Sequence, residues 1–286
     1  MNRTDHSPGL PSTERLQALR IWDSYFTPAY SHPGKDGSSS LMADVERSLP
    51  AIRKCQIEKL CYFSHVGIGT TTDPQFEQLA ASNPEALMKP FQRWPERLFG
   101  MIQLNAHNVE ASIDAINRWI VDGPMQGVYF MGGGPGALTC THANCRRLIE
   151  HIIDVRAVIM QHTWFKTGGK QSDGESTPAE LADVAAAYPE QSFLCAHAGG
   201  EWEQGIRAIQ EQTNILVETS GFDATAGFME MAVRELGAER IVFGSHLPSR
   251  SIGTELGKIL GAQLTEAERF LILGENYRRL LQQNGR

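Results

Sequence analysis

Residues 192–200 read SFLCAHAGG, and this short apolar run that ends at a histidine recurs in altered form elsewhere in the chain. Residues 157–164 read AVIMQHTW, and residues 240–246 read RIVFGSH. A longer segment with the spacing of an amphipathic helix follows each run. Short apolar runs that alternate with helical patterns are typical of a parallel sheet whose strands are joined by crossover helices.

The same alternation extends in both directions along the chain. The predicted strands are residues 19–25, 57–65, 98–105, 127–131, 157–163, 192–198, 214–219 and 240–245. The predicted helices are residues 41–54, 73–88, 109–121, 142–154, 178–188, 201–212, 224–236, 252–260 and 266–283. Eight strand–helix repeats predict an α/β fold, a (β/α)8 TIM barrel. An open doubly wound sheet is the alternative, but it usually has a glycine-rich turn after its first strand, and residues 27–30 read TPAY instead.

Length and charge narrow the class of protein. A chain of 286 residues suits one barrel, so we expect a flexible N-terminal arm at residues 1–19 and a single barrel domain at residues 20–286. The net charge is −7 and no Lys/Arg cluster occurs, which argues against nucleic-acid binding. No apolar run reaches the roughly 18 residues of a membrane span. An odd number of cysteines, two of them in predicted buried strands, favours reduced thiols and a cytoplasmic location.

Histidines stand at the ends of three predicted strands. They are His162, His197 and His246 on strands five, six and eight. The carboxyl ends of barrel strands converge at one mouth, where active sites lie. Imidazole can bind a metal ion or transfer protons near neutral pH. We therefore predict that the three side chains share one pocket, and that Tyr25 from the first strand reaches it as a hydrogen-bond donor or ligand.

At these residues the chain resembles the amidohydrolase-related (amidohydrolase 2) family, in the branch of barrel decarboxylases, hydratases and lactonases. The resemblance is carried by FLCAHAGG at 193–200, ERIVFGSHLP at 239–248 and ILGENYRRLL at 272–281. It implies active-site histidines on strands five and six, here His162 and His197. It also implies hydrolysis of a lactone or amide, or decarboxylation, of a small carboxylated organic substrate, by a protein that often forms homodimers.

The departures from the family pattern concern its metal site. The family's first strand usually ends in Asp-x-His-x-His, whereas residues 23–27 read DSYFT, with Tyr25 and Thr27 in place of the histidines. The last strand usually ends in Gly-Ser-Asp, whereas here His246 replaces the aspartate. Where some members carry a bridging lysine on strand four, this chain has Tyr129. We therefore expect no two-metal centre.

Three interpretations stay open. In the first, His162, His197 and His246 hold one divalent metal ion such as Zn²⁺ with a water molecule, although strands five, six and eight are not all neighbours. In the second, no metal is needed, a histidine acts as general acid or base, and a cation such as Arg250, Lys166 or Lys170 holds an anionic substrate. In the third, the barrel binds a small molecule without catalysis.

Other side chains could complete the pocket. Trp164 directly follows His162 and could form a flat wall, and Gln103 and Asn105 on strand three could orient the substrate. Glu218 on strand seven faces either the pore or the helices, because period-2 alternation alone does not say which. Asp23 could hydrogen-bond a histidine or support the barrel, and His65 ends strand two.

Overall fold

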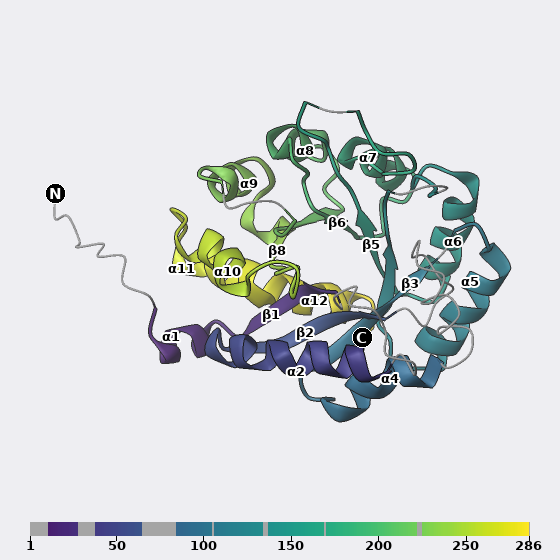
Figure 1. Cartoon of the computed structure of the whole chain (residues 1–286). Coiled ribbons are helices and arrows are strands. Elements are labelled where there is room, and N and C mark those ends of the chain that lie inside the picture. Colours follow the sequence, from purple (N-terminus) through teal and green to yellow (C-terminus); the bar gives the residue numbers. More distant parts are fainter. Residues whose placement is uncertain are drawn as a thin grey trace.

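The computed structural model describes residues 11–27, 38–64, 84–104, 106–133, 137–168, 170–221 and 225–285. Eight parallel strands follow one another in chain order within a single sheet, surrounded by helices (Figure 1). The strands are β1 (Ile21–Phe26), β2 (Ile57–Ser64), β3 (Leu98–Leu104), β4 (Gly127–Phe130), β5 (Val158–His162), β6 (Phe193–Ala196), β7 (Ile215–Glu218) and β8 (Ile241–Val242).

Backbone hydrogen bonds close this sheet between its first and last strands. Ser24 N–H donates to the Phe243 carbonyl and His246 N–H donates to the Tyr25 carbonyl, both over 2.9 Å. Phe26 and Leu247 then form a parallel bridge just beyond β8. The predicted (β/α)8 TIM barrel is therefore confirmed.

The helices lie close to the predicted segments. They are α1 (Thr13–Ala18), α2 (Ser38–Lys54), α4 (Pro84–Arg93), α5 (Val109–Ile116), α6 (Ala143–Asp154), α7 (Pro178–Ala186), α8 (Trp202–Ala208), α9 (Phe228–Leu236), α10 (Ile252–Leu260), α11 (Glu266–Phe270) and α12 (Asn276–Gln283). Residues 73–83 of one predicted helix lie outside the described residues. In the ranges that the structure covers, no helix combines the length and apolar character needed to cross a bilayer.

Part of the predicted N-terminal arm is helical. Ser12 Oγ accepts the Arg15 N–H and caps α1, and Leu16 and Leu19 are buried in the core. Burial of these two leucines gives the segment a reason to pack on the barrel, which its polar composition did not indicate. Residues 1–10 lie outside the described residues, so the arm prediction stays untested there.

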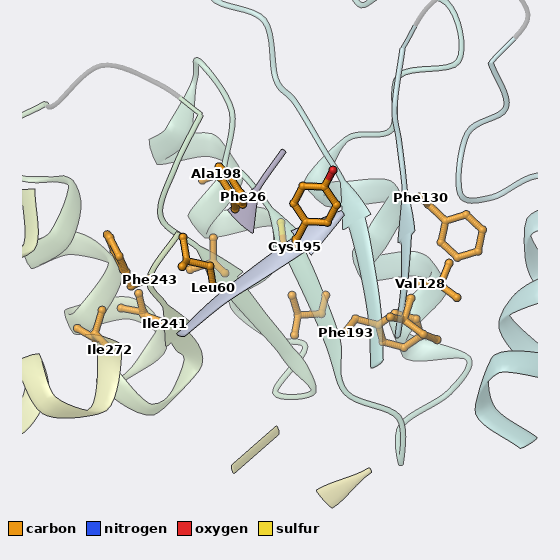
Figure 2. Close-up of a cluster of buried hydrophobic side chains, with 14 of the residues drawn as sticks. Phe26, Leu60, Val128, Phe130, Phe193, Cys195, Ala198, Ile241, Phe243 and Ile272 are labelled. Atoms are coloured by element: carbon orange, nitrogen blue, oxygen red, sulfur yellow. The ribbon is translucent and has the colours of Figure 1, made fainter. Parts of the chain in front are cut away.

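Alternate residues of each strand contribute to two separate hydrophobic cores. One set, including Val128, Phe130 and Phe193, packs between the strands and the surrounding helices (Figure 2). The other set, including Tyr129 and Leu194, fills the barrel interior. Successive side chains of a strand point to opposite faces, so every second residue faces the barrel interior, up to the end of the strand at the mouth. The candidate site residues belong to this inward-facing set.

Candidate functional site

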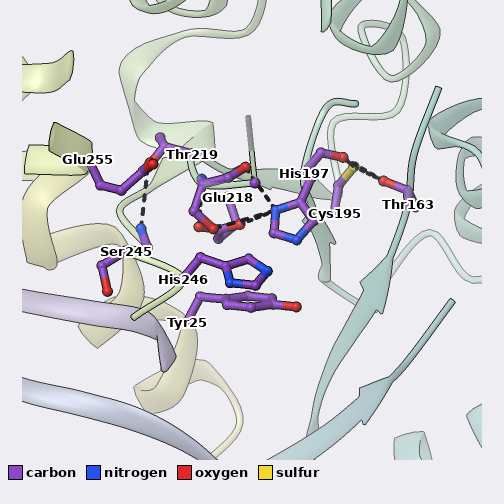
Figure 3. A network of polar contacts seen from close by, with 12 residues as sticks. Tyr25, Thr163, Cys195, His197, Glu218, Thr219, Ser245, His246 and Glu255 are labelled. Atoms are coloured by element: carbon purple, nitrogen blue, oxygen red, sulfur yellow. Dashed lines mark hydrogen bonds and ion pairs between the residues drawn. The ribbon is translucent and has the colours of Figure 1, made fainter. Parts of the chain in front are cut away.

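Four aromatic rings from separate strands meet at the mouth. The centroid of His197 lies 5.1 Å from that of His162, 5.3 Å from that of His246 and 4.8 Å from that of Tyr25. His246 also stacks on Tyr25, with centroids 4.7 Å apart and ring planes 28° apart (Figure 3). The structure thus brings together the four residues that the sequence singled out, and we call them the mouth cluster.

Two members of the mouth cluster have left-handed backbones. His197 has φ 77° and His246 has φ 53°, just after β6 and β8 end. Such angles are uncommon for residues other than glycine and often occur at functional sites. A β-carbon at Gly221 would lie 2.5 Å from the His197 ring, so this glycine is needed for the ring to approach the backbone. Local sequence pattern gives no sign of this arrangement.

The hydrogen bonds of His197 determine which ring nitrogen carries the proton. Its Nδ1 lies 2.8 Å from the Ser220 carbonyl oxygen, which can only accept, so Nδ1–H is the donor. In the neutral ring, Nε2 therefore holds the lone pair. Among the residues that the structure describes, Nε2 of His197 and Nδ1 of His162 are buried without a hydrogen-bond partner. Both nitrogens can therefore accept a hydrogen bond or a proton.

Burial keeps the histidines of the mouth cluster uncharged. Desolvation lowers the pKa of His197 to about 3, although the bond to Ser220 opposes the shift. Desolvation, followed by the nearby His197, lowers the pKa of His246 to about 4. The pKa of His162 is also well below its usual value, mainly through burial. At neutral pH these imidazoles are therefore neutral and can accept hydrogen bonds.

Glu218 lies inside the barrel beside His197, which decides the question that the sequence left open. Its side chain is fully buried, and Oε2 lies 3.0 Å from Nδ1 of His197. Its Oε1 accepts the N–H of Ser220 over 2.7 Å. Burial raises the pKa of Glu218 to about 7 despite these hydrogen bonds.

Asp23 joins β1 to the end of β8. Its carboxylate accepts the Ser245 N–H over 2.9 Å, the Ser245 hydroxyl over 2.5 Å and the Tyr25 N–H over 3.0 Å. Burial raises its pKa to about 7. Of the two roles that the sequence allowed, these contacts favour support of the barrel.

Tyr129 belongs to the mouth and was not among the predicted site residues. Its hydroxyl lies 2.5 Å from that of Tyr25, and its ring stacks on Phe63 with centroids 4.4 Å apart. The sequence did align Tyr129 with a family metal-bridging position. Its bond to Tyr25 could not be foreseen, because 104 residues separate the two in the chain.

The outer candidates occupy different places. Trp164 stands edge-on to His197 with centroids 6.0 Å apart, and Arg250 donates to the Gly221 carbonyl over 3.1 Å. The buried Gln103 amide instead points at the sulfur of Met131. The remaining candidates lie away from the cluster or outside the described residues. Lys166 bonds Ser172 and lies 3.9 Å from Glu175, Lys170 is exposed, and His65 and Asn105 are among the residues not described.

The mouth cluster does not fit a three-histidine metal centre. Nδ1 of His197 is engaged with the Ser220 carbonyl over 2.8 Å and Nδ1 of His246 with Ser249 Oγ over 2.7 Å, so only the Nε2 atoms of these two rings could bind a metal ion. Within the described ranges, no three His, Cys, Asp or Glu side chains form a group that could hold a metal ion. Metal binding by these residues stays a prediction that their geometry does not favour.

Comparison with known proteins adds family and fold. The family model described as amidohydrolase matches residues 37–283, and no curated protein matches the chain. A 2,6-dihydroxybenzoate decarboxylase from Rhizobium is 15% identical with a TM-score of 0.67, over 92% of this chain and 98% of that one.

Two further barrels are similar in structure. A dihydroxybenzoic acid decarboxylase from Polaromonas sp. JS666, solved with manganese and 2-nitroresorcinol, is 17% identical with a TM-score of 0.66, over 92% of this chain and 97% of that one. An uncharacterized TIM-barrel protein from Bordetella bronchiseptica is 15% identical with a TM-score of 0.71, over 93% and 99%. At these identities the likeness concerns the fold alone.

Proposed function

Because this chain belongs to the amidohydrolase family, we propose that it is an enzyme that hydrolyses a lactone or amide bond in a small carboxylated organic molecule. His197 would transfer the proton without a metal ion. The observation that carries this proposal is the state of the His197 ring. Its Nδ1–H is held by Ser220, while its Nε2 is buried, unprotonated and without a partner among the described residues.

The proton transfer follows from the fixed tautomer of His197. Nε2 takes a proton from a water molecule while the water oxygen attacks the substrate carbonyl. The resulting imidazolium returns that proton to the leaving oxygen or nitrogen, so the ring ends as it began. A positioned general base contributes about 10²- to 10⁴-fold to a rate, and the lowered pKa of His197 places this ring at the low end of that range.

The surroundings support a ring-shaped, anionic substrate. Tyr25, Phe63 and Tyr129 form an aromatic wall, and Trp164 stands edge-on to His197. Arg250 lies beside Gly221 and would hold the substrate carboxylate. Homodimer formation stays a prediction from the family resemblance.

Decarboxylation is the second candidate, because several similar structures are decarboxylases of hydroxylated aromatic acids. In that reaction a protonated group must deliver a proton to the carbon that loses carbon dioxide. Burial lowers the pKa of His197, so its neutral form dominates at pH 7 and Nε2 carries no proton to deliver. A non-catalytic binding barrel is the third possibility.

The test is a turnover assay in excess chelator with a panel of cyclic lactones, amides and hydroxylated aromatic acids. The wild type is compared with His197→Asn, because asparagine tolerates the left-handed backbone at this position. We expect a loss in kcat of about 100-fold or more. His142→Asn is the matched control, since His142 caps α6 and asparagine is a good N-cap.

Three outcomes would contradict the proposal. Turnover that disappears with chelator and returns with manganese or zinc would refute the metal-free mechanism. Release of carbon dioxide from the aromatic acids, without hydrolysis of lactones or amides, would favour the second candidate. Calorimetric binding of panel compounds without turnover would favour the binding barrel.

A further inference from the structure

Glu218 is a buried carboxylate of the mouth that the proton transfer described above does not use. We propose that it is a positioning residue for His197. It would hold the ring in the Nδ1–H tautomer and balance the positive charge that forms when Nε2 accepts a proton. This proposal rests on the proposed function, since it assumes that His197 is the base.

One carboxylate oxygen of Glu218 lies close to the His197 ring, as this role requires. Oε1 is fixed by the N–H of Ser220, while Oε2 lies 3.0 Å from Nδ1 of His197. Oε2 has no hydrogen-bond partner of its own among the residues described. The Nδ1–H points to the Ser220 carbonyl, so Oε2 stands beside this bond as a second acceptor (Figure 3).

Two glycines make the space for this pair. A β-carbon at Gly244 would lie 1.9 Å from Oε1 of Glu218, and one at Gly221 would lie 2.5 Å from the ring of His197. Any larger residue at either position would displace the pair. After β8 the chain continues with Gly244, Ser245 and His246, so this segment brings no carboxylate of its own into that space.

The charge on Glu218 depends on several neighbours. Lys258 on α10 is buried, donates to the Thr219 carbonyl over 2.8 Å and pairs with Glu255 over 2.5 Å. Lys258 favours the ionised form of Glu218. The titratable and charged groups that face Glu218 and His197 are Asp23, Tyr25, His162, Cys195, His246, Arg250, Glu255 and Lys258.

Ionisation of Glu218 should therefore control the base. When Nε2 takes a proton from water, an ionised Glu218 faces the imidazolium with the opposite charge. A protonated Glu218 leaves that charge uncompensated in a buried site, which is costly. Burial raises the pKa of Glu218 to about 7, so the change should occur near neutral pH.

The test is NMR of protein labelled with ¹⁵N-histidine, which needs no substrate. The His197 signals are assigned from their loss in His197→Asn. In the wild type we expect the Nδ1–H tautomer, and a shift of the Nδ1–H signal with one inflection near pH 7. In Glu218→Gln the inflection should be absent, because an amide of the same size does not ionise.

Glu255→Gln is the matched control, because burial also raises the pKa of Glu255 to about 7. Removing this negative charge lowers the pKa of Glu218, so the inflection should move to lower pH and persist. An inflection that persists in Glu218→Gln, one that is lost in Glu255→Gln, or an Nε2–H tautomer in the wild type would overturn the proposal. If Glu218→Gln fails to fold, the wild-type and Glu255→Gln titrations still decide.

Kinetics add a second readout once a substrate is known. Glu218→Gln should lower kcat while KM changes little, and the rise of kcat with pH through about 7 should be lost. An unchanged kcat would count against the proposal. If no compound is turned over, the proposed function fails while the NMR result still tests the Glu218–His197 pair.

Discussion

At the scale of single residues, His246 has the least expected surroundings. Its ring stacks on Tyr25 and His197, and its Nδ1 bonds Ser249. Its left-handed backbone turns the side chain toward the mouth. Its ring therefore lies directly against the proposed base, His197.

The test of His246 is to compare His246→Asp with His246→Asn. Asparagine and aspartate both tolerate left-handed backbone, so both variants should fold. The aspartate places a second negative charge near Glu218 and raises its pKa, so we expect turnover to fall by about 10-fold or more. The His246→Asn variant should lose less turnover than His246→Asp. Hydrolytic activity should not become metal-dependent, because Tyr25 and Thr27 still replace the family's histidines.

The measurements are kcat and thermal unfolding of the two variants and the wild type. Unchanged turnover in both variants would remove His246 from the site. Loss of folding in both would mean that its role is structural.

At the scale of elements, the segments after β6 and β7 are held by side chains that bond backbone carbonyls. The Thr163 hydroxyl donates to the His197 carbonyl over 2.6 Å, and Lys258 donates to the Thr219 carbonyl. These bonds fix the irregular backbone that follows each strand. The mouth cluster therefore depends on the geometry of the strand ends as well as on its own side chains.

The Gly244→Ala variant tests how closely the segment after β8 packs against Glu218. The new methyl group would lie 1.9 Å from Oε1 of Glu218 and 2.8 Å from Cβ of Tyr25. We expect a loss of about 1–3 kcal/mol in the free energy of unfolding, as in other overpacked cores. Chemical denaturation measures it.

Gly257→Ala on α10 is the control, because no atom lies within 4 Å of its new methyl group. Alanine in a helix should stabilise this variant by about 0.5–1 kcal/mol. If Gly244→Ala were as stable as the wild type, the close approach of Glu218 to β8 would be refuted.

At the scale of the whole molecule, the barrel buries two kinds of titratable group whose pKa values shift in opposite directions. Burial lowers the pKa values of three histidines and raises those of three carboxyl groups to about 7. They are His162, His197, His246, Asp23, Glu218 and Glu255. Because the pKa values of the histidines are lowered in the folded protein, stability falls as pH drops below about 6.5. Because the pKa values of the carboxyl groups are raised, stability falls as pH rises toward 7.

Glu218→Gln should therefore gain stability relative to the wild type as pH rises. The folded wild type binds the Glu218 proton up to about pH 7, whereas the unfolded chain loses it near 4.5. Between these values Glu218 makes the wild type less stable with rising pH, by at most about 1.4 kcal/mol per pH unit. Urea unfolding at several pH values measures the difference, and a constant difference would contradict the raised pKa.

Sequence alone determined the barrel, because its signal is local. Each strand is a short apolar run, each helix has its own periodicity, and Thr177 and Glu180 form a capping box at the start of α7. The strand-end positions of His162, His197 and His246 follow from the same pattern, since a barrel brings all strand ends to one mouth.

Only the tertiary structure decided how these side chains meet. The side on which Glu218 lies, the bond between Tyr25 and Tyr129 and the stacking of His246 depend on contacts between strands far apart in the chain. Period-2 alternation leaves both faces open until the register is known. Ring orientation further depends on the left-handed backbones of His197 and His246, which neighbouring glycines and carbonyl contacts make possible. That orientation is a property of packing that residue types alone do not encode.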